Sequence, residues 1–376
     1  MIKIGFIVNP IAGMGGAVGL KGTDGNIYIE ALKRGAKPVA PERAHRFMKT
    51  LNTYMKGKNS DLFILTPPNI MGEDHVVDTD LNYRILEINI SKPTTADDTK
   101  RCARKLCELG TDLIVFVGGD GTARDIISVL RDTTPILGVP SGVKMYSAVF
   151  APSPEAAAYI VSKFIEGSTE LVDAEVLDID EEAFRKNILS VKLYGVAKTI
   201  TISRFYIGSK VVVSASEEEK IAIAKTIAEE WGNDTLYIVG PGSTTRAVTQ
   251  LLGLPKTLLG IDIYLGTKVI ALDVNEKKLL EIVPKYPKKK LIISPIGGQG
   301  FVLGRGNQQI SPKVLRYISK EDIIIVVLPS KLRITKVFWV DTGDPEVDKQ
   351  LEGFYKAVTG YREYTMIKIL AASHIQ

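Results

Sequence analysis

The chain has 376 residues, a net charge of +5, and 45% hydrophobic and 24% charged residues, a composition typical of a soluble globular protein. This length exceeds what one hydrophobic core usually serves, so we expect two domains. No apolar run approaches the ~18 residues of a membrane span. Residues 1–8 are too short for the apolar region of a signal peptide. These features predict a cytoplasmic protein that does not bind membranes.

Composition also argues against several kinds of site. Cys102 and Cys107 are too few for a disulfide scaffold or a cysteine-based zinc site. The three histidines form no metal-binding pattern. Lysines cluster at 285–290 next to prolines, which predicts an exposed turn. Without a repeated basic and aromatic stripe we expect no nucleic-acid partner, although a modest basic excess suits phosphorylated ligands.

Strands and helices are predicted to alternate through the first half of the chain. Residues 94–110 begin at a Thr-Thr cap and end at Gly110, as a helix does, and residues 40–56 have apolar positions at helical spacing. The other predicted elements are strands at 2–8, 61–68, 83–89, 111–117 and 135–142, and helices at 123–130 and 153–167. This alternation predicts an α/β domain with a mostly parallel sheet in three layers.

The pattern changes to short strands after about residue 166. One helix is predicted at 216–231, a strand at 322–329 and a helix at 345–358. We therefore predict an α/β nucleotide-binding domain at 1–165, a β-rich substrate domain at 166–310, and a C-terminal segment at 311–376 that packs back on the first domain.

The stretch VFVGGDGTARDI places one carboxylate among glycines where a strand ends and a helix begins. Ligands bind beyond the carboxyl ends of strands in open α/β sheets, near helix N-termini. Glycines at 118, 119 and 121 let backbone N–H groups approach phosphate oxygens, and Thr122 offers a hydroxyl. Asp120 would repel a phosphate, so it fits either a phosphate-bound metal or a base for an attacking hydroxyl. A tight turn with an aspartate cap is the structural alternative.

A second glycine-rich loop, NPIAGMGG, follows the first strand. Asn9, Gly13, Gly15 and Gly16 are its candidate phosphate-binding residues. It is not a Walker A loop, because no Gly-Lys-Ser/Thr occurs, and its spacing is not that of a Gly-x-Gly-x-x-Gly dinucleotide fingerprint. A dehydrogenase is therefore not expected.

Together these two loops resemble those of the NAD kinase and diacylglycerol kinase superfamily, whose hallmark is Gly-Gly-Asp-Gly-Thr. GLKGTDG, GVKMYSAVFAPSPEAA, GPGSTTRAV and SPIGGQGFVLGRGNQQISP are similar to the ATP-NAD kinase-like branch that includes acetoin-catabolism protein X and archaeal relatives. The resemblance covers residue 4 to about residue 315. It implies the NAD kinase-like fold, an α/β domain followed by a β-rich domain.

The resemblance also implies roles for individual residues. Asp120 would assist attack of the adenosine-ribose 2′-hydroxyl of NAD on the γ-phosphate of ATP. The rest of its motif would lie beside the phosphates. GPGSTTRAV is similar to the loop that lines the dinucleotide in NAD kinases, so the substrate-side candidates are Gly242, Ser243, Thr244 and Thr245. Capping of the following helix is compatible with that role.

Other segments carry weaker signals. Arg305, Asn307 and Gln308 suit a pyrophosphate, a ribose or a base edge, although Arg305 could instead pair with a carboxylate. Ser141, Lys144 and Asp24 are further substrate-side candidates; Lys144 could equally be a surface lysine, and simple turn chemistry could explain Asp24. The chain lacks a convincing Asn-Glu pair of the kind that holds adenosine in typical NAD kinases, which leaves the acceptor open.

We therefore expect a kinase that uses ATP and Mg²⁺, with NAD as the first candidate acceptor. The alternatives are a kinase of another small polyol or lipid-like alcohol, and a non-catalytic nucleotide-binding regulator. Its partners would be small-molecule nucleotides. Related kinases form homo-oligomers, which predicts a homodimer or homotetramer. The sequence does not identify which residues would hold the metal ion.

Overall fold

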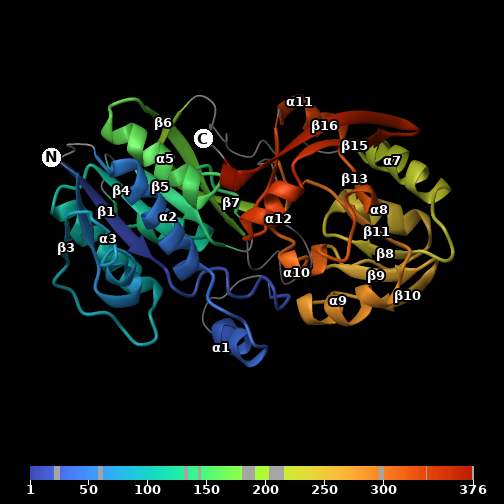
Figure 1. Cartoon of the computed structure of the whole chain (residues 1–376), viewed down its shortest axis with the longest axis horizontal. Coiled ribbons are helices and arrows are strands. Elements are labelled where there is room, and N and C mark those ends of the chain that lie inside the picture. Colours follow the sequence, from blue (N-terminus) through green and yellow to red (C-terminus); the bar gives the residue numbers. More distant parts are fainter. Residues whose placement is uncertain are drawn as a thin grey trace.

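The computed structural model describes residues 1–20, 26–57, 62–130, 134–142, 145–179, 191–202, 216–295, 300–335 and 337–374. None of the helices within these ranges has the length and apolar character needed to traverse a bilayer. The N-terminal α/β domain occupies one end of the long axis, and a strand-rich C-terminal region occupies the other (Figure 1).

The first sheet has five parallel strands in the order β3-β2-β1-β4-β5. Its central strand β1 is flanked on both sides: Ile4 lies opposite Ile64 of β2 and Leu113 of β4. Strands buried on both faces read as continuous apolar runs, which explains the composition of β1 and β4. The bounds are β1 Ile2–Val8, β2 Leu62–Thr66, β3 Tyr83–Ile85, β4 Leu113–Gly118 and β5 Ile136–Pro140.

Helices cover both faces of this sheet. α2 (Ala40–Met55) and α5 (Pro154–Ile165) pack on one face, and α3 (Ala96–Glu108) and α4 (Asp120–Ile127) on the other. The predicted three-layer α/β domain is therefore confirmed. α3 begins with a capping box, in which Thr95 and Asp98 satisfy each other's backbone N–H groups, so the predicted helix starts within two residues of its expected position.

A long antiparallel hairpin, β6 (Glu170–Ile179) and β7 (Val191–Thr201), follows the first sheet. It packs on α4 and β5. Ala174, Val176 and Ala197 enter the same hydrophobic core as α3 and α4. The hairpin therefore covers the end of the sheet where α4 begins.

The second sheet has the order β10-β9-β8-β11-β13. Strands β8, β11 and β13 run parallel to one another, and β9 runs antiparallel to both of its neighbours, β8 and β10. α7 (Glu217–Glu229) and α8 (Ser243–Leu251) pack on one face, while α9 (Glu276–Ile282) and α10 (Pro312–Leu315) pack on the other. The strand bounds are β8 Leu236–Val239, β9 Asp262–Leu265, β10 Lys268–Ala271, β11 Lys289–Ile293 and β13 Ile323–Ile325.

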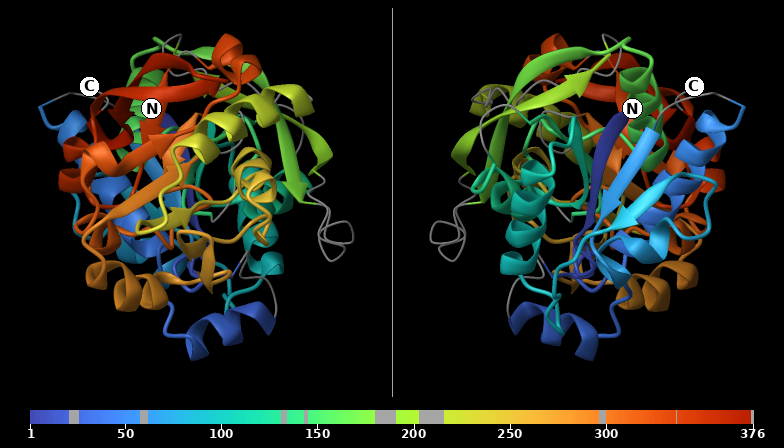
Figure 2. Two further views of the ribbon diagram at one scale, coloured as in Figure 1. Left: turned by 90° about the vertical axis from the view of Figure 1, so that its right-hand side faces the viewer. Right: turned by 90° about the vertical axis from the view of Figure 1, so that its left-hand side faces the viewer.

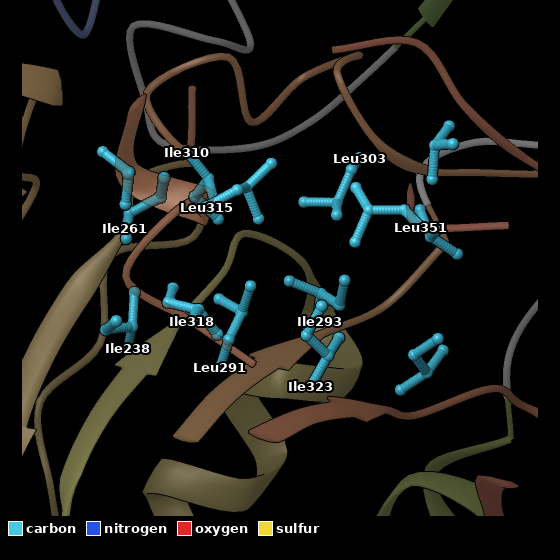
Figure 3. Packing of buried hydrophobic residues seen from close by; sticks show 14 of the residues in the cluster. Ile238, Ile261, Leu291, Ile293, Leu303, Ile310, Leu315, Ile318, Ile323 and Leu351 are labelled. Carbon is cyan, nitrogen blue, oxygen red and sulfur yellow. The ribbon is translucent and has the colours of Figure 1, made fainter. Parts of the chain in front are cut away.

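A third sheet, in the order β12-β14-β16-β15, completes the C-terminal region. Its strands are β12 Phe301–Leu303, β14 Phe338–Val340, β15 Gly353–Gly360 and β16 Glu363–Ala371. Figure 3 shows the core shared with the second sheet, where Leu291 and Ile293 lie near Leu303 and Leu351. Because side chains from both sheets form one hydrophobic cluster, neither sheet buries its apolar face alone.

The helix predicted at 345–358 is wrong in its second half. α12 covers only Pro345–Gln350, and β15 begins at Gly353. Gly353 has φ +123°, a conformation that ends a helix and favours glycine. From there Phe354 is exposed and Tyr355 buried, the alternation of a half-buried strand, and β16 provides the pairing partner.

The C-terminal segment contacts both parts of the molecule. β14 pairs within the third sheet, whereas the last turn, Ala372–His374, contacts α5. Arg43 of α2 donates two hydrogen bonds to Asp341, to Oδ1 at 2.6 Å and Oδ2 at 2.9 Å, and both side chains are buried. The remaining short helices are α1 (Asn26–Lys33), which projects from one edge in every view, and α11 (Pro329–Ile334) (Figure 2).

The buried pair of Arg43 and Asp341 is expected to stabilise the contact between the first domain and the C-terminal segment. Arg43→Met leaves a buried carboxylate without its main partner, which should lower the free energy of unfolding by about 3 kcal/mol. Denaturant titration of purified protein measures this change. As a control, Lys288→Met removes the exposed pair with Asp234 and should cost less than ~1 kcal/mol; equal effects would contradict the prediction.

Candidate functional site

The first sheet has a topological switch point between β1 and β4. The chain leaves β1 toward β2 on one side, whereas it leaves β4 toward β5 on the other. The loops that follow these two strands lie at the carboxyl ends of the strands, the usual ligand position in open α/β sheets. Both glycine-rich loops predicted to bind phosphate lie at this edge.

Hydrogen bonds hold the two loops together. The Nδ2 atom of Asn9 donates to Oγ1 of Thr122 at 2.9 Å, and the Asn9 backbone N–H donates to the carbonyl of Val117 at 2.9 Å. The pairing of Asn9 with the Gly-Gly-Asp-Gly-Thr loop, far apart in sequence, is thus a direct side-chain contact. Gly15 and Gly16 lie buried in the turns after Asn9.

Glycines allow the loops after β1, β4 and β5 to approach one another. Gly13 has φ +81°, and a Cβ atom there would lie 1.8 Å from the carbonyl oxygen of Ser141. A Cβ atom on Gly119 would lie 3.1 Å from Cα of Gly142. Only glycine fits at position 13, and a Cβ atom at position 119 would be tightly packed, so backbone packing as well as any ligand sets the composition of the loops.

The loop after β4 runs from Gly118 directly into α4. Gly119 is the N-cap residue, and no side chain caps the helix. The first N–H groups of a helix have no acceptor within it, and the described residues provide none for those of Asp120, Gly121 and Thr122. Together with the helix dipole they suit an anion such as a phosphate.

Asp120 is 4% exposed at the first position of α4. Its Oδ1 accepts hydrogen bonds from the N–H of Ser147 at 3.0 Å and from the Ser147 hydroxyl at 2.6 Å. Its Oδ2 accepts one from the N–H of Tyr146 at 2.6 Å. The carboxylate therefore faces the segment after β5 rather than open solvent.

Burial raises the pKa of Asp120 to about 7, despite opposing hydrogen bonds from Ser147 and Tyr146. The negative charge of Asp178 on β6 adds to the rise. Asp178 itself accepts a hydrogen bond from Nη1 of Arg124 at 2.6 Å. A carboxyl group with a pKa near neutrality can exchange a proton at physiological pH, as a general base must.

Ser141 directly follows β5, and Gln308 contacts the same loop. Ser141 is 5% exposed, and its hydroxyl has no hydrogen-bond partner among the residues that the structure describes. The Gln308 amide donates to the carbonyl of Gly142 at 3.4 Å, and its side chain packs on Gly16. The loop that contains Gln308 thus reaches from the C-terminal region to the glycine-rich loops of the first domain.

Arg305 and Asn307 contact protein atoms in this structure. Nη2 of Arg305 donates to the carbonyls of Ala151 and Pro152, and its guanidinium lies over the ring of Phe301. Burial lowers the pKa of Arg305 to about 9. Asn307 bridges its own loop: Oδ1 accepts from the N–H of Gly304, and Nδ2 donates to the carbonyl of Val302.

Residues 242–245 lie beside the second sheet, where the loop after β8 leads into α8. β8 and β11 are adjacent and parallel, and the chain leaves β8 toward β9, on the side away from β11. Gly242 has φ +126° and precedes α8, Ser243 is exposed, and Thr245 Oγ1 donates to the carbonyl of Gly240 at 2.8 Å. Thr244 is buried. Within the described ranges, no hydrogen bond or ion pair joins this loop to Asp120.

Two predicted site residues, Asp24 and Lys144, lie outside the described residues. Conversely, sequence reasoning missed the surroundings of Asp120: Tyr146, Ser147, Asp178 and Arg124. GVKMYSAVFAPSPEAA contributed to the family resemblance, but nothing in it or in VLDID marked these residues as neighbours of Asp120. Only the i, i+4 spacing of Asp120 and Arg124 on α4 could have indicated that both face the same neighbour.

No group of three or more His, Cys, Asp or Glu side chains suited to a metal ion occurs in the described part of the chain. Mg²⁺ commonly binds substrate phosphates, with only one or two carboxylates from the protein. We therefore treat Mg²⁺ as part of a nucleotide substrate and assign it no protein ligand.

Comparison with protein families gives two matches. Residues 4–169 match the ATP-NAD kinase N-terminal domain, and residues 232–369 match the ATP-NAD kinase C-terminal domain. No curated protein matches. Two solved structures from Bacillus anthracis str. Sterne, both assigned as diacylglycerol kinases, are similar at 15% identity, with TM-scores of 0.24 and 0.25. They cover 47% and 48% of this chain, and the chain spans 42% and 51% of theirs.

The close approach of Gly13 to Ser141 predicts a position-specific effect of alanine. Gly13→Ala should destabilise the protein by several times the ~1 kcal/mol that a positive φ alone costs, because the new methyl group meets a backbone oxygen. Gly35→Ala is the matched control, since Gly35 has φ +78° and nothing within 4 Å. Thermal unfolding of both variants checks this, and equal losses would refute the role given to the contact.

Proposed function

Because the chain belongs to the ATP-NAD kinase family, we propose that it transfers the terminal phosphate of ATP to a hydroxyl group. The first candidate acceptor is the adenosine-ribose 2′-hydroxyl of NAD, which would give NADP. The observation that carries this proposal is the buried carboxylate of Asp120 at the N-terminus of α4, between two loops suited to phosphates.

The reaction needs one proton acceptor and a place for the phosphates. The acceptor oxygen forms a bond to the γ-phosphorus, the bond from that phosphorus to the β,γ-bridging oxygen breaks, and ADP leaves. Among the described residues, Oδ2 of Asp120 accepts one hydrogen bond, from Tyr146, so its second lone pair can take the proton of the acceptor hydroxyl. The N–H groups at the start of α4 hold the phosphates, and catalysis is mainly positioning and charge stabilisation.

A second candidate acceptor is a small polyol or a lipid-like alcohol. The chain has no convincing Asn-Glu pair at the position where typical NAD kinases hold adenosine, which favours an acceptor of a different shape. In that case the role of Asp120 is unchanged, because any alcohol must lose a proton on phosphorylation.

The test is ADP release by purified protein with MgATP and NAD, NADH, nucleosides, polyols or lipid alcohols as acceptors. We expect turnover with NAD and a product of NADP. Turnover with a non-nucleotide alcohol alone would replace NAD as the acceptor, and no turnover with any acceptor would reject the kinase proposal. Asp120→Asn is the matched variant: it keeps a hydrogen-bond acceptor but cannot take a proton, so kcat should fall at least ~100-fold with an unchanged circular dichroism spectrum.

The pKa of Asp120, raised to about 7 by burial, predicts the pH dependence of turnover. A base must be ionised, so kcat should be constant well above pH 7 and fall about tenfold per pH unit well below it. Steady-state kinetics between pH 5 and pH 9 in buffers of constant ionic strength give this profile. An acid limb centred near pH 4, the ordinary range of a carboxyl group, would mean that Asp120 is not the titrating base.

A further inference from the structure

Ser147 connects Asp120 to the hairpin that covers it. Its hydroxyl lies 2.6 Å from Oδ1 of Asp120 and 2.9 Å from the carbonyl oxygen of Leu177 on β6, and it accepts a hydrogen bond from the Leu177 N–H at 3.0 Å. Ser147 is completely buried. Its hydroxyl therefore takes part in a closed set of contacts between the carboxylate and the backbone of β6.

A serine hydroxyl has one hydrogen to donate, yet this one has two acceptors within reach. An ionised carboxylate is the stronger acceptor, since charge-assisted hydrogen bonds are shorter and stronger than neutral ones. A protonated Asp120 is a weaker acceptor, comparable to the carbonyl of Leu177. Rotation of the hydroxyl therefore lets Ser147 donate to Asp120 when the carboxylate is charged and to the Leu177 carbonyl when it is protonated. Neither state requires movement of the backbone.

We propose that Ser147 is a positioning residue for Asp120: its hydroxyl donates to the carboxylate before proton transfer and turns to the Leu177 carbonyl once Asp120 holds the proton. This inference rests on the proposed function, in which Asp120 is the base. The backbone N–H groups of Tyr146 and Ser147 keep the carboxylate in place in both states.

Several charged or titratable groups face Asp120 from the surrounding elements. Asp178 on β6 disfavours the charged carboxylate, and its partner Arg124 lies one turn along α4 from Asp120. Tyr146 lies close enough for the carboxylate to raise the pKa of its phenol. Arg305 is attracted to Asp120 through space. Within the described part of the chain, only Ser147 both donates through its side chain to Asp120 and has an alternative acceptor on another element.

Ser147→Ala tests the proposal, because it removes the hydroxyl and leaves both backbone donors. Loss of a hydrogen bond that favours the charged form raises the pKa of a carboxyl group. The acid limb of the kcat profile should move up by about one pH unit. Activity then falls about tenfold at pH 6 but only about twofold at pH 8. A purely structural role would lower kcat by the same factor at every pH.

Two further variants act as controls. Thr199→Val removes another buried hydroxyl of the same hairpin, which donates to the carbonyl of Ile136 at 2.7 Å, and it should leave the pH profile in place. Asp178→Asn removes a negative charge near Asp120 and should move the acid limb to lower pH. If Ser147→Ala does not fold, Ser147→Cys, a weaker donor, should give a smaller upward shift.

A direct titration separates this inference from the proposed function. The pH titration of the Asp120 carboxyl is followed by NMR in protein labelled with ¹³C at aspartate carboxyls, and the signal is assigned by its loss in Asp120→Asn. An upward shift in Ser147→Ala, and none in Thr199→Val, supports the coupling even if no acceptor is phosphorylated, in which case the kinase proposal alone fails. Equal titration midpoints in wild type and Ser147→Ala would overturn the role of Ser147.

Discussion

Burying the carboxylate of Asp120 is costly unless donors surround it, and the first domain supplies those donors from a different loop. Tyr146 and Ser147 follow β5, whereas Asp120 follows β4. The carboxyl ends of these adjacent parallel strands must therefore be held in register. That requirement explains why glycines allow the loops after β1, β4 and β5 to meet, and why the hairpin of β6 and β7 covers the helix that begins at Asp120.

The contacts between the two parts of the molecule converge near this site. Gln308 reaches the loop at Gly142, Arg305 donates to the carbonyls of Ala151 and Pro152, and Asp341 pairs with Arg43. Loss of either partner from a buried ion pair such as that of Arg43 and Asp341 leaves a buried charge unpaired, which is costly. The edge of the first sheet where β1 and β4 end is thus in contact with the C-terminal region.

Much of the first domain followed from local sequence signals. The apolar strands, the capping box at Thr95 and the glycine-rich loops predicted a three-layer α/β fold, and the structure has it. The prediction of a helix at 345–358 is wrong from Gly353 onward, because this segment pairs with β16 as a strand despite its helical pattern. Local propensity is a weak guide where a long-range partner strand is available.

The sequence by itself determined which functional groups the candidate site contains. These are an aspartate among glycines at the end of a strand and a second glycine-rich loop that begins at Asn9. These signals are local, since a strand, a turn and a helix start are encoded within about ten neighbouring residues. Only the tertiary structure decided what surrounds Asp120. Nothing in the sequence around Ser147 and Asp178 marked them as neighbours of Asp120. Their effect on the carboxylate depends on distance and burial, which arise when separate strands meet at one edge of a sheet.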